Sequence, residues 1–256
     1  MSNKIDKDIL KNPDVFVSTS DKIFNYVEHH FKTAATVVLA LIIGGAAYVA
    51  LGWLDSRKEL KAAEAMYVPE AALRKTQESF QESKTAKPGD KDKAKPEKTE
   101  DFAHDYAATV EQIKTAIKDH ADTRAALVSA LSLSSFLIQQ KQYPAALEVM
   151  QLAKFTPPPT DLLAGFQQMQ NGLVHLENGQ VDPAIEAYDK ILKSDALKAF
   201  HPEALLKMGV CREMKGDQAK AREAYERLSR EFPETEAAQN AAQYLRLMQM
   251  KPAQQG

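Results

Sequence analysis

The hydrophobic positions along the chain follow two different patterns. One is a continuous stretch, TAATVVLALIIGGAAYVALGWL, which covers residues 33–54 without a charged side chain. The other begins after residue 100, where apolar residues return every three or four positions, as they do on one face of a helix. No segment alternates apolar and polar residues as a half-buried strand does. These patterns predict an all-α protein.

The continuous stretch has the length and the flanks of a membrane-spanning helix. At about 1.5 Å per residue it crosses the roughly 30 Å hydrocarbon core of a bilayer. Lys32 precedes it and Arg57 follows it, while Tyr48 and Trp53 lie near its end, where aromatic rings favour the membrane interface. A cleaved signal peptide fits less well, because the preceding segment is long and as acidic as it is basic. We therefore predict a transmembrane helix at residues 33–54.

Charge alone leaves the orientation in the membrane open. Basic residues are more numerous after the stretch than before it, and the positive-inside rule would then place the C-terminal part in the cytoplasm. Large domains, however, translocate largely regardless of charge.

The remaining chain divides by composition. Residues 1–32 form an N-terminal segment, and residues 55–82 read as a membrane-proximal helix that continues out of the membrane, with a break at Pro69. Residues 83–100 (SKTAKPGDKDKAKPEKTE) have no aromatic or large aliphatic side chain. Such a segment buries too little surface to offset its chain entropy, which predicts a flexible Lys-rich loop. Residues 101–250 carry the helical periodicity.

One pattern occurs three times within residues 101–250. Each copy has a helix with a small residue in its middle, a turn, and a second helix with an alanine followed four residues later by a larger side chain. The small residues are Ser134, Gly172 and Gly209, the alanines are Ala146, Ala184 and Ala221, and the larger residues are Met150, Tyr188 and Tyr225. Small residues let the two helices approach closely, and the larger ones are expected to fill the space between neighbouring hairpins. Gly179 and Gly216 suit the positive φ at a helix end.

These positions resemble the signature of the tetratricopeptide repeat over residues 125–233. The corresponding alanines are 38 and 37 residues apart, against 34 in a standard repeat, so each connection is lengthened. The resemblance implies a tetratricopeptide-like α-solenoid of helical hairpins. A single hairpin leaves an apolar face exposed, so several must stack. Residues 101–119 are expected to pack before the array, and Glu234–Met250 to form a C-terminal capping helix.

Few residues point to chemistry. The net charge of −2 gives no basis for binding nucleic acid. The sequence has no phosphate-binding, dinucleotide-binding or metalloprotease motif, and its histidines are not spaced as metal ligands. Cys211 is the single cysteine, which excludes an intramolecular disulfide, and its place beside Gly209 favours a buried packing role. We therefore predict no catalytic residue, no metal and no cofactor.

Recognition is the alternative to catalysis. In a repeat array the first helices of successive hairpins line one concave surface. By the register of the repeats, seven apolar residues face this groove: Val128, Leu131, Phe166, Met169, Leu173, Leu206 and Val210. An apolar groove suits a hydrophobic helical segment of a partner protein. The competing interpretation is that the chain's own helix at 102–117 fills the groove.

The order of the parts carries a second resemblance. A single N-terminal span, a helix continuous with it and C-terminal repeats, together with YVEHHFKTAATVVLALIIGGAAYVALGWLDSRKELKAAEAMY, resemble the YfgM-type family of ancillary subunits of the Sec translocon. The resemblance implies a bacterial inner-membrane protein with its N-terminus in the cytoplasm and its repeats in the periplasm. It implies Sec translocon subunits, a membrane-anchored chaperone of the PpiD type and exported clients as protein partners. The chain would then be a scaffold or chaperone-like subunit that assists Sec-dependent protein export.

Two other functions fit the same parts. The repeats could hold together a different envelope complex without a chaperone role. They could also form a cytoplasmic-facing receptor for a peptide tail, which requires the opposite topology and is favoured by a basic groove that the sequence does not show.

Overall fold

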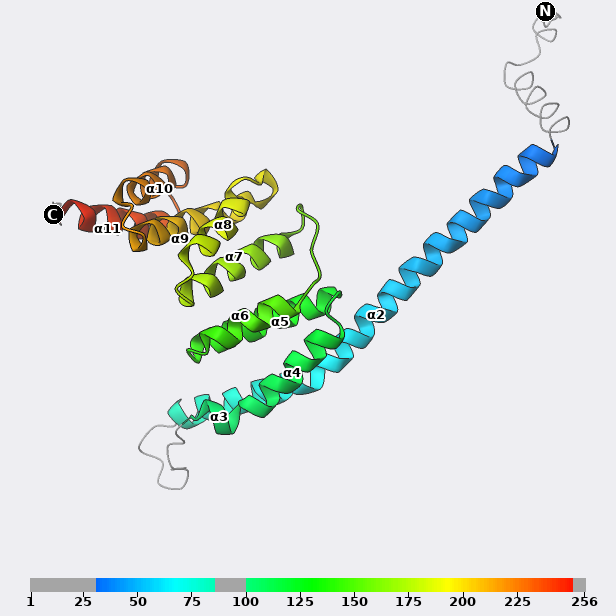
Figure 1. The fold of residues 1–256 in the computed structure, drawn as a ribbon, viewed down its shortest axis with the longest axis horizontal. Helices are drawn as coiled ribbons and strands as arrows, with labels where there is room; N and C mark the ends of the chain where they lie inside the picture. The colour runs from blue at the N-terminus through cyan, green and yellow to red at the C-terminus, as the bar shows by residue number, and fades with distance from the viewer. Residues whose placement is uncertain (1–30, 86–99, 251–256) are drawn as a thin grey trace, which may run out of the picture. The chain divides into compact units, whose positions relative to one another are not determined.

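The computed structural model describes residues 31–85 and 100–250, and every regular element in these ranges is helical (Figure 1). The elements are α2 (Phe31–Thr85), α3 (Phe102–Asp105), α4 (Ala107–Asp119), α5 (Arg124–Gln139), α6 (Tyr143–Leu152), α7 (Leu162–Glu177), α8 (Val181–Leu192), the 3₁₀ helix η1 (Asp195–Phe200), α9 (His201–Met214), α10 (Gln218–Glu231) and α11 (Glu236–Met250). The prediction of an all-α fold is confirmed.

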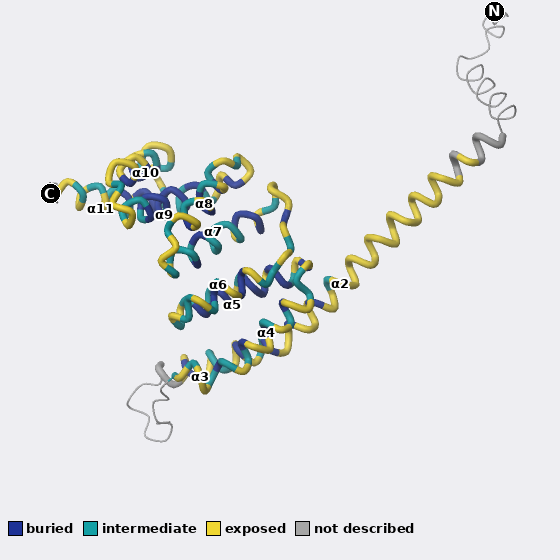
Figure 2. The backbone as a smooth tube through the Cα atoms, viewed as in Figure 1, coloured by how far each residue is buried: buried dark blue, intermediate teal, exposed yellow. Residues whose placement is uncertain are grey.

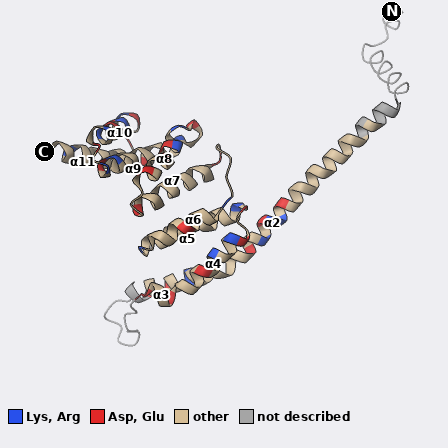
Figure 3. Cartoon of the chain, viewed as in Figure 1, with Lys and Arg blue, Asp and Glu red and all other residues tan. Residues whose placement is uncertain are grey.

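The chain divides within α2 into two compact units, residues 1–57 and 58–256. In the described part of the first unit the apolar side chains are exposed, and residues 33–54 carry no charged side chain (Figures 2 and 3). Among the described residues, α2 is the one helix long and apolar enough to cross a membrane. At the end of the stretch the Arg57 guanidinium lies 4.0 Å from the centre of the Trp53 ring, a cation–π contact. We therefore regard the apolar first part of α2 as a candidate membrane span.

The predicted break at Pro69 is wrong, because Pro69 lies inside α2. Proline removes one backbone hydrogen bond and crowds the carbonyl one turn earlier, which usually ends or kinks a helix. Here its ring is buried, and so are Met66 and Leu73 on either side of it. Packing against the second unit's core therefore maintains a helix that the local sequence would interrupt.

The same helix runs past the expected start of the Lys-rich loop. It ends at Thr85, and residues 86–99 of that predicted loop lie outside the described ranges. Residues 1–30 of the predicted N-terminal segment also lie outside them.

Three helical hairpins, α5–α6, α7–α8 and α9–α10, follow one another in the second unit (Figure 1). Each turns at a residue with positive φ: Lys141 (58°), Gly179 (72°) and Gly216 (76°). After each of these residues a backbone N–H donates to the carbonyl five residues earlier, as from Gln142 to Leu137 at 2.8 Å. The prediction for both glycines is confirmed, and Lys141, for which positive φ was not predicted, has the same conformation.

The glycines in the middle of the first helices lie under tyrosine rings of the second helices. A Cβ added at Gly172 would lie less than 3.0 Å from ring atoms of Tyr188, and one added at Gly209 equally close to Tyr225. Both rings are fully buried. Tyr188 also belongs to a cluster with Met208 of the next hairpin. Each ring therefore packs within its own hairpin, and Tyr188 also fills space between hairpins.

The connections between hairpins are long for two different reasons. An irregular segment joins α6 to α7, and the backbone N–H groups of Lys154 and Phe155 in it donate to the carbonyl of Ala121. Between α8 and α9 the chain forms η1, whose Leu197 is buried. These insertions account for the long repeat spacing.

Part of α2 belongs to the second unit's helical stack. Glu59 accepts hydrogen bonds from the backbone N–H groups of Arg124 and Ala125 at the start of α5. Near the other end, the Phe80 ring lies 6.0 Å from the ring of Tyr106. The Tyr106 ring in turn lies edge-on to Phe136, near the end of α5, at 4.9 Å.

The second part of α2 thus runs alongside α5 in the same direction. Its buried residues join those of α4, α5 and α6 in one hydrophobic cluster. It therefore takes the place of the first helix in an additional hairpin, with α4 as the second helix. The prediction that residues 101–119 pack before the array described only half of this hairpin.

Candidate functional site

The candidate site is the side of α5, α7 and α9 that does not pack against the second helices of the hairpins. We call it the first-helix face. Its apolar residues are Val128, Leu131, Leu162, Phe166, Met169, Leu173, Val210 and Met214. Helices α5 and α7 pack against each other, and η1 also packs against α7. The candidate site therefore centres on α7, which has both α5 and η1 as neighbours.

Six of the seven residues predicted for the groove keep some exposure on this face. Val128 is 46% exposed and Phe166 is 56% exposed. Leu131, Met169, Leu173 and Val210 are half-buried.

The seventh residue, Leu206, is only 7% exposed and lies in the cluster that α9 forms with α10 and α11. Helix α11, which was predicted to cap the array, contacts both α9 and α10. Leu206 is thus a core residue with little surface for a partner. Leu131 and Met169 hold the same repeat position, and both also pack against a core cluster.

Three further residues enlarge the face. Leu162 and Met214 are each 57% exposed, and each lies one helical turn from a predicted residue, Phe166 or Val210. That spacing of four was visible in the sequence. The third is Phe200 of η1, whose ring lies edge-on to Phe166 with ring centres 5.0 Å apart. We refer to Leu162, Phe166 and Phe200 as the apolar patch.

Gly165 makes the contact between η1 and α7 possible. A Cβ at this position would lie less than 3.0 Å from the Phe200 ring, so a larger residue would displace the ring. Phe200 belongs to an insertion outside the repeat, and repeat register alone could not place it beside α7.

The described residues leave the patch uncovered. Residues 102–117, the competing occupant of the groove, fall mostly in α4. Val110, Ile113 and Ile117 of α4 are buried in the cluster with α2, α5 and α6. That helix therefore packs into the core, away from the exposed Leu162 and Phe166.

A polar network lies at the beginning of the first helices. The Glu59 carboxylate of α2 caps the first N–H groups of α5, the Arg124 side chain pairs with Asp161, and Asp161 accepts a hydrogen bond from the N–H of Leu163 at 2.9 Å. The guanidinium and this N–H hold the pKa of the Asp161 carboxyl below its usual value. The network connects α2, α5 and α7 beside the apolar patch.

Reactive groups are not gathered on this face. Cys211 is buried, and burial raises the pKa of its thiol to about 11, which keeps it protonated at neutral pH. Within residues 31–85 and 100–250, no three His, Cys, Asp or Glu side chains form a group that could hold a metal ion. What the arrangement offers is a surface for binding.

The chain is similar to known proteins in two respects that bear on this site. The tetratricopeptide repeat family matches residues 203–235, which cover most of α9 and all of α10. The chain is also 26% identical over 125 residues to a protein of Aggregatibacter actinomycetemcomitans described as an ancillary SecYEG translocon subunit. That similarity covers 49% of this chain and 59% of the relative, so less than two thirds of the relative's length is matched. The repeat match favours a protein-interaction role for this part of the chain.

Proposed function

We propose that this chain is a membrane-anchored protein-interaction subunit that assists Sec-dependent protein export, as a scaffold or a chaperone-like protein. The observation that carries the proposal is the uncovered apolar patch on the first-helix face of a repeat array whose chain also contains a candidate membrane span. The relative's description as a translocon subunit supports the site of action.

The size of the patch fits weak binding that depends on membrane anchoring. Full burial of a Leu or Phe side chain is worth about 1.5–3 kcal/mol. Leu162 and Phe166 are already almost half covered, so a partner gains roughly 1 kcal/mol from each. Association itself costs at least several kcal/mol. A partner held in the same membrane meets the patch at an effective concentration that offsets much of this cost.

The proposal includes a topology and a set of partners. The span at residues 33–54 lies in the bacterial inner membrane, with the N-terminus in the cytoplasm and the repeats of residues 101–250 in the periplasm. The partners are translocon subunits, a membrane-anchored chaperone of the PpiD type and exported clients. The resemblance to the YfgM-type family supports this assignment, and the positive-inside rule speaks against it.

Protease accessibility tests the topology. Digestion of the repeats in intact spheroplasts is the expected result, because periplasmic domains are then open to added protease. Protection until the spheroplasts are lysed would place the repeats in the cytoplasm and favour a cytoplasmic peptide receptor instead. A cytoplasmic marker protein that survives in the intact sample is the control for leakage.

Photocrosslinking tests the partners. A photoreactive amino acid at Leu162 should form adducts with translocon subunits, the anchored chaperone or exported proteins in living cells. The same amino acid at Leu247, which is exposed on α11, is the matched control and should give few of these adducts. Adducts from Leu162 to subunits of an unrelated envelope complex would support the structural-scaffold alternative and contradict the export role.

A further inference from the structure

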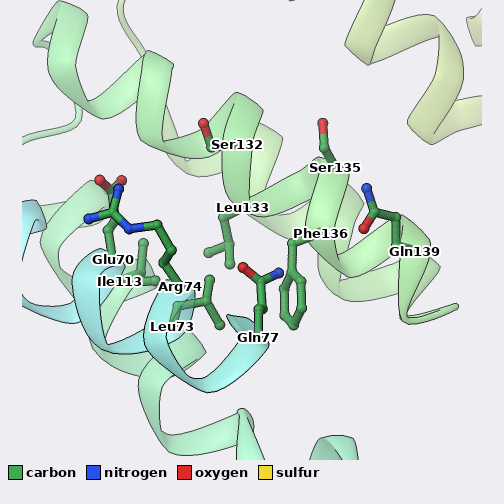
Figure 4. Close-up of a pocket in the computed structure, with 10 residues that line it drawn as sticks. All are labelled: Glu70, Leu73, Arg74, Gln77, Ile113, Ser132, Leu133, Ser135, Phe136 and Gln139. Carbon is green, nitrogen blue, oxygen red and sulfur yellow. The ribbon is translucent and has the colours of Figure 1, made fainter. Parts of the chain in front are cut away.

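A pocket of about 330 Å³ lies between α2 and α5, separate from the apolar patch (Figure 4). Its floor consists of four buried apolar side chains from three helices: Leu73 from α2, Ile113 from α4, and Leu133 and Phe136 from α5. The floor therefore favours an apolar group. This pocket lies where the membrane-linked helix meets the first predicted repeat.

The mouth of the pocket carries two glutamine side chains. Gln77 projects from α2 and Gln139 from α5, and their carboxamides lie on either side of the Phe136 ring in Figure 4. Neither carboxamide has a hydrogen-bond partner among the described residues. A carboxamide donates and accepts, as a peptide group does. An extended polypeptide presents unpaired N–H and C=O groups, whereas a helix has already paired them internally.

The charges at the mouth are balanced. Glu70 and Arg74 lie one helical turn apart on α2, and Glu70 accepts a hydrogen bond from the Ser129 hydroxyl. Ser132, which is exposed, also lines the pocket. A carboxylate next to a guanidinium attracts neither a phosphate nor a metal cation strongly. The mouth is thus complementary to neutral, dipolar peptide groups.

We propose that this pocket binds one bulky apolar side chain of an extended protein segment, and that Gln77 and Gln139 hydrogen-bond the backbone on either side of it. The volume is at the lower end of the range for ligand sites, and a helix, about 10 Å across, is too wide to enter. The ligand class is therefore an unfolded or extended client segment, distinct from the helical partner expected for an apolar groove. This inference rests on the proposed function, in which the partners are proteins.

Peptide binding to the full chain in lipid nanodiscs tests the proposal. The probe is a fluorescent Gly/Ser decapeptide with one central Phe, and binding is followed by fluorescence anisotropy. The same peptide with a central Ser should bind at least tenfold more weakly. The double variant Gln77→Ala/Gln139→Ala should bind the Phe peptide about tenfold more weakly, because two hydrogen bonds are lost. The control Gln243→Ala removes an exposed glutamine from α11 and should bind as wild type.

The other outcomes are decisive as well. Unchanged affinity of the double variant, or no binding to the wild-type chain, overturns the pocket assignment. Tighter binding of a helix-stabilised peptide with the same Phe overturns the preference for an extended segment. In any of these cases the crosslinks from Leu162 decide the proposed function independently. Circular dichroism melting curves of all variants exclude unfolding as the cause.

Discussion

The ring of Tyr225 lies against Gly209 and leaves no room for a Cβ at that position. The ring also stacks on Tyr244, with ring centres 5.2 Å apart, and its hydroxyl donates to Glu213 at 2.6 Å. A ring held in this way cannot move aside at low cost. This contact explains why a residue that weakens helices stands in the middle of α9.

Gly209→Ala should therefore destabilise the protein. The gain in helix propensity is about 1 kcal/mol, whereas overpacking a core typically costs about 1–3 kcal/mol. We expect a net loss of up to about 2 kcal/mol, measured by urea unfolding of the full chain in detergent.

A matched variant tests the cause of that loss. The first hairpin combines Ser134 with Met150 at the corresponding positions, so a Cβ is tolerated beside the more flexible methionine. In a Tyr225→Met background, Gly209→Ala should cost less than it does in the wild type. An equal cost in both backgrounds would show that the tyrosine ring is not the obstacle.

Lys141→Gly should stabilise the protein. Lys141 has φ of 58°, a left-handed conformation that costs a non-glycine residue about 1–2 kcal/mol. Glycine removes this strain but loses more entropy on folding, by up to about 1 kcal/mol. The expected net gain is roughly 0.5 kcal/mol, seen as a higher urea midpoint. The reciprocal variant Gly179→Lys should lower the midpoint, and a lower midpoint for Lys141→Gly would contradict the argument.

Glu59→Ala should loosen the start of α5. The carboxylate accepts from two backbone N–H groups that have no partner within the helix. Loss of a cap costs about 1 kcal/mol, and amide hydrogen exchange should accelerate at residues 124–127. Glu64→Ala removes an exposed carboxylate from the same helix and serves as the control. Equal effects of the two variants would argue against a capping role for Glu59.

Asp161 should make the free energy of unfolding depend on pH. Its pKa in the folded state lies below the ordinary value of 3.8, through the hydrogen bonds from Arg124 and from the N–H of Leu163. The ionised carboxylate therefore stabilises the fold above that ordinary pKa, and the contribution disappears as the pH falls through the lower, folded-state pKa. Wild type should exceed Asp161→Asn in urea midpoint at pH 5, and the difference should shrink towards pH 2. A constant difference would contradict the assigned pKa shift.

The repeats were predictable because close packing between helices requires small and large side chains at fixed positions, and these sizes can be read from the sequence. Gly172, Ala184 and Tyr188 recur at the same offsets in the next hairpin, where the glycine again packs against the tyrosine ring and the alanine is again buried. The turn at Lys141 was not predictable, since lysine gives no signal for positive φ. The helix through Pro69 and the contact of Phe200 with Gly165 depend on tertiary packing, which local sequence patterns do not contain.

The exposed part of the candidate site was partly predictable. Repeat register placed Val128 and Phe166 on the first-helix face, where both are exposed. It also placed Leu206 there, because register alone does not reveal that α11 packs over α9. The pocket beside Gln77 could not be predicted, because it requires α2 to run alongside α5.

The central claim is that the first-helix face recruits partners at the translocon. Its most direct test is quantitative co-purification from solubilised membranes after Phe166→Asp, with Leu247→Asp as a control that places the same charge at an equally exposed site. The account predicts that Phe166→Asp loses most of the co-purifying translocon subunits, whereas Leu247→Asp retains them and both proteins melt as wild type. Full retention of those subunits by a folded Phe166→Asp protein would contradict it.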